Sequence, residues 1–334
     1  MLLKPYQSPH DRIAVAPMMA YTDSHCRYLL RLLHPTARLY TEMITAHALV
    51  YGDASRLLAF DASEHPVALQ LGGADPAMLG EAARLGALAG FDEINLNVGC
   101  PSDRVQSGRF GACLMAEPFV VADCVRAMIA AVPPHVAVTV KCRIGIDDRD
   151  DYAFLESFVE TVRTAGVDTF IVHARKAVLS GLSPRQNREI PPLRYEIPLR
   201  LKQEQPALRI VLNGGLRSTE QVKEWLPRFD GVMLGRQAYQ EPYLLAELHH
   251  ELDTPRAPLP ERSAILLAYA DYVDRQLDSG HRLVSMLRHV LGLYAGMPSA
   301  RAWRRFLVEQ GARPGARGDV LRSSLQFFRR RDAA

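Results

Sequence analysis

The 334-residue sequence lacks several features that would each assign it to a particular class of protein. Its five cysteines form no CxxC pair and no Cys/His cluster, which argues against a disulfide framework, a structural zinc site and an iron–sulfur cluster. No apolar run approaches the length of a membrane span, and the opening MLLKPYQSPHD has no apolar stretch of the kind found in targeting peptides. We therefore expect a cytoplasmic protein with reduced thiols, no metal ion and no membrane partner.

Lysine is absent from residues 261–334, yet this segment carries the excess positive charge of the chain. It contains 13 arginines and seven acidic residues, for a net charge of +6, whereas the preceding 260 residues have 27 basic and 30 acidic residues, for a net charge of −3. A concentrated basic segment suggests a polyanionic partner, although a solvated helical face also explains the charge.

The sequence is rich in short apolar runs that alternate with helical patterns. Hydrophobic residues make up 48% of the chain, enough for a large core. Eight runs read as strands: 13–17, 38–43, 66–73, 93–97, 136–143, 169–175, 209–215 and 231–236. Because these runs are continuously apolar and are separated by helices, they indicate parallel strands buried on both faces. Eight such units predict an α/β fold, the (β/α)₈ TIM barrel.

The pattern changes after the proline-rich segment TPRAPLPE (254–261) and becomes wholly helical. Helices are expected over 261–279, 282–295, 299–310 and 318–330, which would form a small all-helical domain. We therefore predict a catalytic barrel domain over residues 1–250 and a helical domain over residues 258–334.

In a (β/α)₈ barrel the catalytic residues lie at the carboxyl ends of the strands. In this sequence, glycines follow the seventh and the eighth predicted strands. Gly214 and Gly215 follow the seventh strand, and Gly235 and Arg236 follow the eighth. Glycines let backbone N–H groups approach a phosphate, and an arginine adds charge. A tight turn would explain the glycines alone, but the two signals together predict a phosphate site.

Polar side chains end other strands. Lys141 could be a Schiff-base nucleophile, a charge partner or a ligand for the electron-rich edge of a flavin. With His173 and Gln70, it matches the donors and amide groups that an isoalloxazine ring needs. A phosphate at one end and a polar-edged ring at the other predict FMN. The full set of expected cofactor-binding residues is Pro17, Met18, Met19, Gln70, Lys141, His173, Asn213, Gly214, Gly215, Gly235 and Arg236.

Six motifs in the barrel and one in the tail occur in the order typical of one known family. They are NLNVGCPSDRVQSGRFGACLM, VKCRIGIDD, IVHARKA, GLSPRQNREIPPL, NGGLRS, GVMLGRQAY and RHVLGLYAGMPSARAWRRFL. Together they resemble the tRNA-dihydrouridine synthase family, in particular its A branch, over nearly the whole chain. The resemblance implies FMN-dependent, NADPH-driven reduction of the uracil C5–C6 bond in tRNA, at D-loop positions 20 and 20a.

The resemblance also implies roles for single residues. Cys100 matches the family's proton donor to C5, opposite the hydride that reduced flavin delivers to C6. An unperturbed thiol is largely protonated at neutral pH and gives up its proton readily. A uracil turned out of its stack could hydrogen-bond Asn97. The expected contacts with tRNA phosphate and ribose are Arg185, Arg188, Arg301 and Arg304.

Alternatives remain at this point. A dehydrogenase of free pyrimidines would share the flavin and the cysteine, but it leaves the basic helical segment unexplained. A flavin-free aldolase would use Lys141 as a Schiff base, and a non-catalytic RNA-binding protein would use the barrel only as a scaffold. A yellow colour of the purified protein would argue against the aldolase and the non-catalytic RNA-binding protein. Binding of tRNA would distinguish the family's reaction from a dehydrogenase of free pyrimidines. No obligatory protein partner is implied.

Overall fold

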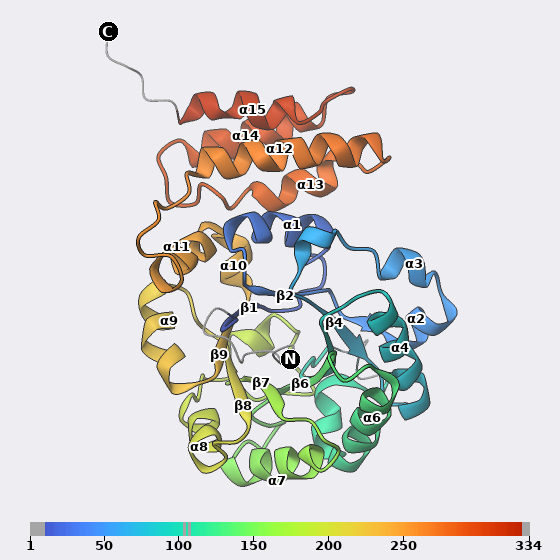
Figure 1. The fold of residues 1–334 in the computed structure, drawn as a ribbon. Helices are drawn as coiled ribbons and strands as arrows, with labels where there is room; N and C mark the ends of the chain where they lie inside the picture. Colours follow the sequence, from blue (N-terminus) through green and yellow to red (C-terminus); the bar gives the residue numbers. More distant parts are fainter. Residues whose placement is uncertain (1–10, 103–104, 106–107, 329–334) are drawn as a thin grey trace. The chain divides into compact units, whose positions relative to one another are not determined.

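The structure is a computed structural model that describes residues 11–102, 105 and 108–328 (Figure 1). The chain divides into two compact units. Unit 1 comprises Met1–Ala20 and Thr36–Gly235, and unit 2 comprises Tyr21–Pro35 and Arg236–Ala334. Within the described ranges, no helix is both long and apolar enough to cross a membrane. The expected division into a catalytic domain (1–250) and a tRNA-binding domain (258–334) concerns function and stays a prediction.

Unit 1 contains a closed barrel of parallel strands. Its members are β1 (Ile13–Val15), β2 (Arg38–Tyr40), β4 (Val67–Gly72), β5 (Glu93–Val98), β6 (Ala137–Arg143), β7 (Thr169–His173), β8 (Arg209–Asn213) and β9 (Gly231–Leu234). They follow the order β2-β1-β9-β8-β7-β6-β5-β4, and the pairing of β2 with β4 closes the ring. The eight strands occupy the eight predicted runs, and the predicted (β/α)₈ barrel is confirmed.

One strand of the sheet was not predicted. The short β3 (Ile44–Thr45) pairs with the end of β4 through Ile44 opposite Leu71 and Thr45 opposite Gly72. The second predicted run, 38–43, therefore ends early, because β2 stops at Tyr40 and the chain re-enters the sheet only at Ile44.

Helices surround the barrel of unit 1 (Figure 1). They are α2 (Ala46–Tyr51), α3 (Ala54–Leu57), α4 (Pro76–Leu88), α6 (Pro118–Ala131), α7 (Tyr152–Arg163), α8 (Glu196–Glu204) and α9 (Thr219–Trp225), with the 3₁₀ turns η1 (Ala62–Glu64), η2 (Gly111–Ala116), η3 (Gln186–Arg188) and η4 (Leu226–Arg228). Several of these helices begin at residues suited to capping. Asp75 and Asp151 accept hydrogen bonds from N–H groups in the first turns of α4 and α7, and Pro76 occupies the first turn of α4.

An apolar cluster inside the barrel takes side chains from or next to six of its strands. A buried cluster joins small residues of β1 and β4 to larger ones across the barrel: Ala14, Ala16, Tyr40, Ala68, Ile171, Val211 and Met233. Alternating small and large side chains fill a barrel without leaving a pore. Chemistry is therefore confined to the strand ends.

Unit 2 is helical in the part of it that the structure describes. It contains α1 (Ser24–Leu33), α10 (Arg236–Gln240), α11 (Tyr243–Leu252), α12 (Arg262–Asp278), α13 (Leu283–Val290), α14 (Ala300–Gly311), α15 (Asp319–Ser324) and the 3₁₀ turn η5 (Leu325–Phe327). The four predicted tail helices are present, but α13 and α15 are shorter than expected. Residues 329 and 330 of the last predicted helix lie outside the described residues.

Trp303 anchors the tail helices. Its ring is fully buried, lies 4.9 Å from the ring of Tyr294 and 5.9 Å from that of Phe328, and its Nε1 donates a hydrogen bond to Ser324 Oγ over 2.8 Å. The segment RAWRRF therefore belongs to an amphipathic helix with Trp303 in the core and its three arginines exposed.

Candidate active site

The register of the barrel aligns the polar side chains at four neighbouring strand ends. Asn97 on β5 lies opposite Lys141 on β6, and two residues further along β6 Arg143 lies opposite His173 on β7. His173 in turn lies opposite Asn213 on β8. Residues from four distant parts of the sequence therefore form one row along the carboxyl edge of the sheet.

Lys141 is tied into this row by its side chain. Its Nζ donates to Asn213 Oδ1 over 2.9 Å, and Asn213 Nδ2 donates to the carbonyl oxygen of Met233 over 2.8 Å. Burial, together with the nearby Arg143 guanidinium, lowers the pKa of Lys141 to about 8. At neutral pH the amine is therefore protonated and donates hydrogen bonds, and it loses its proton close to pH 8.

His173 is uncharged in this setting. Burial first, and then the charges of Arg143 and Lys141, hold the pKa of His173 well below its ordinary value. A neutral imidazole keeps one donor and one acceptor nitrogen, so it can bind either edge of a polar ring.

Cys100 lies in a turn that side chains hold on both sides. The backbone N–H groups of Gly99 and Cys100 donate to Asn97 Oδ1 over 2.9 and 3.0 Å. Arg143 Nε donates to the carbonyl oxygen of Gly99 over 2.8 Å. The thiol is only partly buried, in contrast to a cysteine that fills core volume.

The 3₁₀ turn η2 completes this environment. Ala112 N–H donates to the Cys100 carbonyl oxygen over 2.9 Å, and Gly111 has a φ of +78°. A Cβ at Gly111 would lie 2.6 Å from that carbonyl oxygen, so only glycine fits here. The Cys100 thiol lies 3.5 Å from Ser102 Oγ.

The other cysteines differ from Cys100 either in their burial or in the groups around the thiol. Cys26, Cys124 and Cys142 are buried, and Cys113 directs its partly buried thiol at the Phe110 carbonyl oxygen. Burial raises the pKa of both Cys124 and Cys142 to about 12, which leaves these thiols inert at neutral pH.

The glycines after β8 and β9 differ in what surrounds them. Gly214 and Gly215 have φ values of +119° and +72°, and a Cβ at Gly214 would lie 2.7 Å from His173 Cδ2. At Gly235, by contrast, a Cβ would meet nothing within 4 Å. The backbone of Gly235 therefore borders open space, as a phosphate approached by backbone N–H groups requires.

The remaining residues predicted to bind the cofactor lie at three places. Pro17, Met18 and Met19 follow β1, where Met18 packs on the barrel core and Met19 is exposed. Gln70 is buried on β4. Arg236 is the first residue of α10 and belongs to unit 2.

Asn97 has a task in the barrel that sequence reasoning missed. Its Oδ1 holds the Cys100 turn, while its Nδ2 donates to Gln70 Oε1 over 3.2 Å and to Met43 Sδ over 3.0 Å. Contact with a uracil base therefore stays a prediction for a residue that already has several partners.

The expected tRNA-binding arginines are exposed. Arg185 precedes η3 and Arg188 is its last residue. Arg185 forms an ion pair with Glu189 over 3.6 Å. Among the described residues, neither Arg301 nor Arg304 on α14 lies in an ion pair. Their charge is thus available to a polyanion, whereas Arg317 is neutralised within unit 2 by Asp274 and Asp278.

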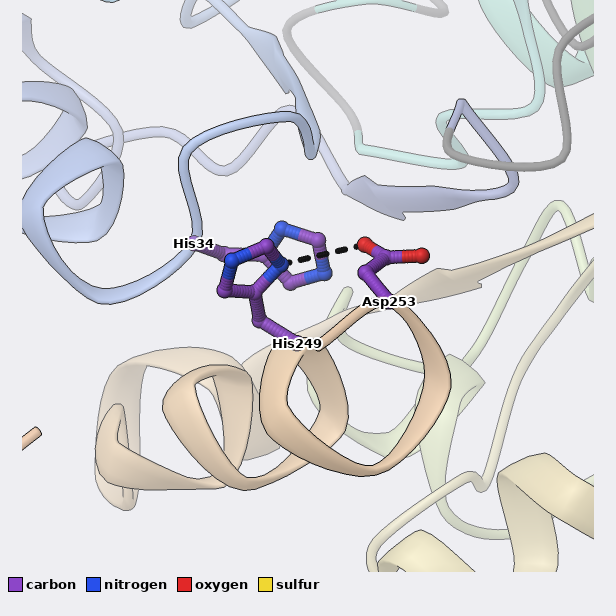
Figure 2. A group of neighbouring side chains, drawn as sticks. All are labelled: His34, His249 and Asp253. Carbon is purple, nitrogen blue, oxygen red and sulfur yellow. Dashed lines mark hydrogen bonds and ion pairs between the residues drawn. The ribbon is translucent and has the colours of Figure 1, made fainter. Parts of the chain in front are cut away.

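A separate group in unit 2 has the composition of a metal site. His34 follows α1, and His249 and Asp253 lie one helical turn apart at the end of α11 (Figure 2). One ligand atom from each residue lies within 4.8 Å of the others. The cysteine and histidine spacing gave no hint of this group, because His34 is more than 200 residues away from the other two in sequence.

Similarity to known proteins extends over nearly the whole chain. Residues 14–328 match the family described as dihydrouridine synthase (Dus). The tRNA-dihydrouridine(20/20a) synthase of Xanthomonas campestris pv. campestris is 55% identical over 317 residues, which cover 94% of this chain and 93% of the relative. The protein of the same name from Vibrio vulnificus is 53% identical over 315 residues, 94% of this chain and 96% of the relative.

A solved structure shares the fold at low sequence identity. The complex of 2-naphthoyl-CoA reductase with 2-naphthoyl-CoA superposes with a TM-score of 0.56 on 72% of this chain and 50% of its own, at 10% identity. This likeness concerns the fold alone.

Proposed function

Because the chain belongs to the dihydrouridine synthase family, we propose that it reduces uridine to 5,6-dihydrouridine in the D-loop of tRNA, with FMN as bound cofactor and NADPH as reductant. One observation carries the proposal above all others: the match includes both the barrel and the helical tail, from residue 14 to residue 328. Positions 20 and 20a are the proposed targets, by similarity to the named relatives.

The barrel residues fit a flavin mononucleotide. The open space beside the Gly235 backbone suits a phosphate, and Lys141 and the neutral His173 are polar groups suited to the pyrimidine edge of the ring. Gln70 and Asn213 add amide groups, and Met18 adds an apolar wall. When bound, the flavin supplies the hydride that the reduction of uracil requires.

Cys100 supplies the proton in this proposal. Saturating the C5–C6 bond takes a hydride at C6 and a proton at C5, and the thiol holds that proton at Sγ until transfer. Arg143 lies close enough to interact with the charge of the thiolate left behind. The hydrogen bonds to the Gly99 and Cys100 backbone hold the turn that carries the thiol, so proton transfer requires no prior rearrangement of this turn.

The substrate reaches the barrel as a base turned out of its stack. Arginine contacts to phosphates supply affinity and register without reading the sequence, and Arg185, Arg188, Arg301 and Arg304 are proposed for this task. A dehydrogenase of free pyrimidines remains the second candidate, because the barrel alone would suffice for it.

The test measures dihydrouridine in tRNA. Purified protein, FMN, NADPH and unmodified tRNA should yield dihydrouridine in the D-loop, and free uracil should not be reduced at a comparable rate. A protein that reduces free uracil and leaves tRNA unchanged would overturn the proposal in favour of the second candidate.

A further inference from the structure

A chain of buried polar side chains crosses the inside of the barrel and ends at the Cys100 turn. Each member donates a hydrogen bond to the next, away from the turn. We call it the polar relay; from the turn inward its members are Asn97, Gln70, Asn95, Thr139 and Glu93.

The links of the relay are short and point one way. Asn97 Nδ2 donates to Gln70 Oε1 over 3.2 Å, and Gln70 Nε2 donates to Asn95 Oδ1 over 2.7 Å. Asn95 Nδ2 donates to Thr139 Oγ1 over 2.8 Å, and Thr139 Oγ1 donates to Glu93 Oε1. All five side chains are buried, so water offers them little alternative.

The direction of such a chain needs an anchor. An amide can turn its oxygen or its nitrogen to either neighbour, and a hydroxyl can donate or accept, so the middle members allow both directions. A carboxylate can only accept; burial raises the pKa of Glu93, while the Arg38 guanidinium and the Thr139 and Tyr40 hydroxyl donors favour its ionised form. Glu93 accepts from Tyr40 Oη over 2.6 Å as well as from Thr139, and it pairs with Arg38 Nε over 3.4 Å.

The anchor fixes what the relay offers at its other end. Because the Thr139 hydroxyl donates its proton to Glu93, its oxygen accepts from Asn95 Nδ2. Asn95 then has only its oxygen left to accept from Gln70, and Gln70 in turn accepts from Asn97. Asn97 therefore presents its oxygen to the turn, where the N–H groups of Gly99 and Cys100 need an acceptor. A reversed relay would place an amide NH₂ group against these two donors.

We propose that Glu93 is a positioning residue for Cys100: its carboxylate sets the direction of the polar relay and thereby holds the turn that presents the thiol. Glu93 touches neither substrate nor thiol and acts only through the relay. The inference deepens the proposed function, since it rests on the role of Cys100 as proton donor.

Three variants test the relay. Glu93→Gln places an NH₂ group beside Thr139, because the Arg38 guanidinium attracts the amide oxygen and repels the nitrogen. Thr139→Val removes the hydroxyl at similar shape and leaves Glu93 in place, and this variant serves if Glu93→Gln does not fold. Thr139→Ser keeps the hydroxyl and is the matched control.

The deciding measurement is hydrogen exchange of the Gly99 and Cys100 amides in the flavin-loaded protein. Both relay-breaking variants should exchange these amides on the order of tenfold faster, the equivalent of about one hydrogen bond, whereas Thr139→Ser should match the wild type. Turnover with tRNA should fall in the same two variants and should be normal in Thr139→Ser.

The outcomes separate the relay from the proposed function. Unchanged exchange in a folded Thr139→Val variant would overturn the relay, whatever the turnover. Faster exchange with normal tRNA turnover would show that the relay holds the turn without serving the reaction, and it would overturn Glu93 as a positioning residue, whereas loss of turnover in Cys100→Ala tests the proton donor itself.

An independent observation in unit 2 carries a second inference. His34, His249 and Asp253 bring two imidazoles and a carboxylate together, with His249 Nδ1 and Asp253 Oδ2 already 3.1 Å apart. Ligands bound to one zinc ion at about 2.0–2.2 Å lie a little over 3 Å from one another, so a side-chain movement of about 1 Å would close the group.

The chemistry of the group favours zinc. Two nitrogen ligands and one carboxylate oxygen suit a borderline cation in a four-coordinate site, with water as the fourth ligand. We infer that the group binds one zinc ion and ties the end of α11 to the residue that follows α1.

The experiment titrates the whole protein with Zn²⁺ against a chelating dye at pH 7. His249→Ala should bind one equivalent less than the wild type, and its melting temperature should no longer rise with zinc. His250→Ala, the neighbouring histidine on the same helix, is the matched control and should behave as the wild type does. Equal binding by both variants, or no binding by the wild type, would overturn the inference.

Discussion

Replacing Gly235 by alanine adds one methyl group to the turn after β9, where it meets nothing within 4 Å and where φ is not positive. At such a position alanine stabilises a folded protein by about 0.4–1 kcal/mol, because it restricts the unfolded chain. The flavin-free Gly235→Ala protein should therefore melt at the same temperature as the wild type or slightly above it.

FMN binding should respond in the opposite direction. If the Gly235 backbone approaches the phosphate, the methyl group fills the space that the phosphate needs. Losing one hydrogen bond to a charged group costs about 1.5–3 kcal/mol, which raises the Kd for FMN roughly 10- to 150-fold. Fluorescence titration of the flavin-free protein with FMN measures this change directly.

Gly215→Ala is the contrasting variant. With a φ of +72°, and with the new methyl group overlapping Leu193 and lying 2.9 Å from Tyr195 Oη, it should lower the melting temperature as well as the affinity for FMN. A Gly235→Ala protein that melts normally and binds FMN as tightly as the wild type would refute the phosphate assignment after β9.

Two further predictions concern charge. Lys141 holds its proton only up to about pH 8 when folded, and up to about pH 10.4 when unfolded, so its burial destabilises the flavin-free fold at neutral pH. Relative to Lys141→Met, the wild type should gain up to ~3 kcal/mol in free energy of unfolding between pH 7 and about 10.5. Denaturant titrations at several pH values measure this, and the same pH dependence of the unfolding free energy in both proteins would contradict it. Arg301→Gln combined with Arg304→Gln should flatten the slope of log affinity for tRNA against log salt by somewhat under one unit per lost contact, whereas Arg317→Gln, a residue paired within unit 2, should leave that slope unchanged. An unaltered slope in the stably folded double variant would count against α14 as a tRNA contact.

The barrel could be predicted because its strands are buried on both faces. Continuous apolar runs such as VAVTVKCR mark such strands, and helices with regular apolar spacing separate them. The short β3 could not be predicted, because Ile44 and Thr45 gain their partners only from the end of β4. The end of α13 at Val290 was missed for a similar reason: Gly292 packs its backbone against the carbonyl group of Gln240, a tertiary contact that the sequence pattern does not contain.

The site could be predicted to the extent that it follows from strand ends. Lys141, His173 and Asn213 end up close together because they lie at or near the ends of neighbouring strands: His173 and Asn213 are the last residues of β7 and β8, and Lys141 lies two residues before the end of β6. The polar relay could not be found in this way. Thr139 and Glu93 meet only through the register of β5 and β6, and register depends on the closure of the whole barrel rather than on local residues.

The reaction itself is tested most directly by replacing Cys100 with alanine. In this variant, reduction of bound flavin by NADPH should proceed as in the wild type, whereas formation of dihydrouridine in tRNA should fall by roughly the 10²–10⁴ typical of a lost general acid. Cys113→Ala, which removes the other partly buried thiol, should leave both steps unchanged. Single-turnover oxidation of the reduced flavin by tRNA is the measurement to make: a rate at least about a hundredfold lower in Cys100→Ala is the predicted result, and a near-normal rate would contradict the assignment of Cys100 as the proton donor.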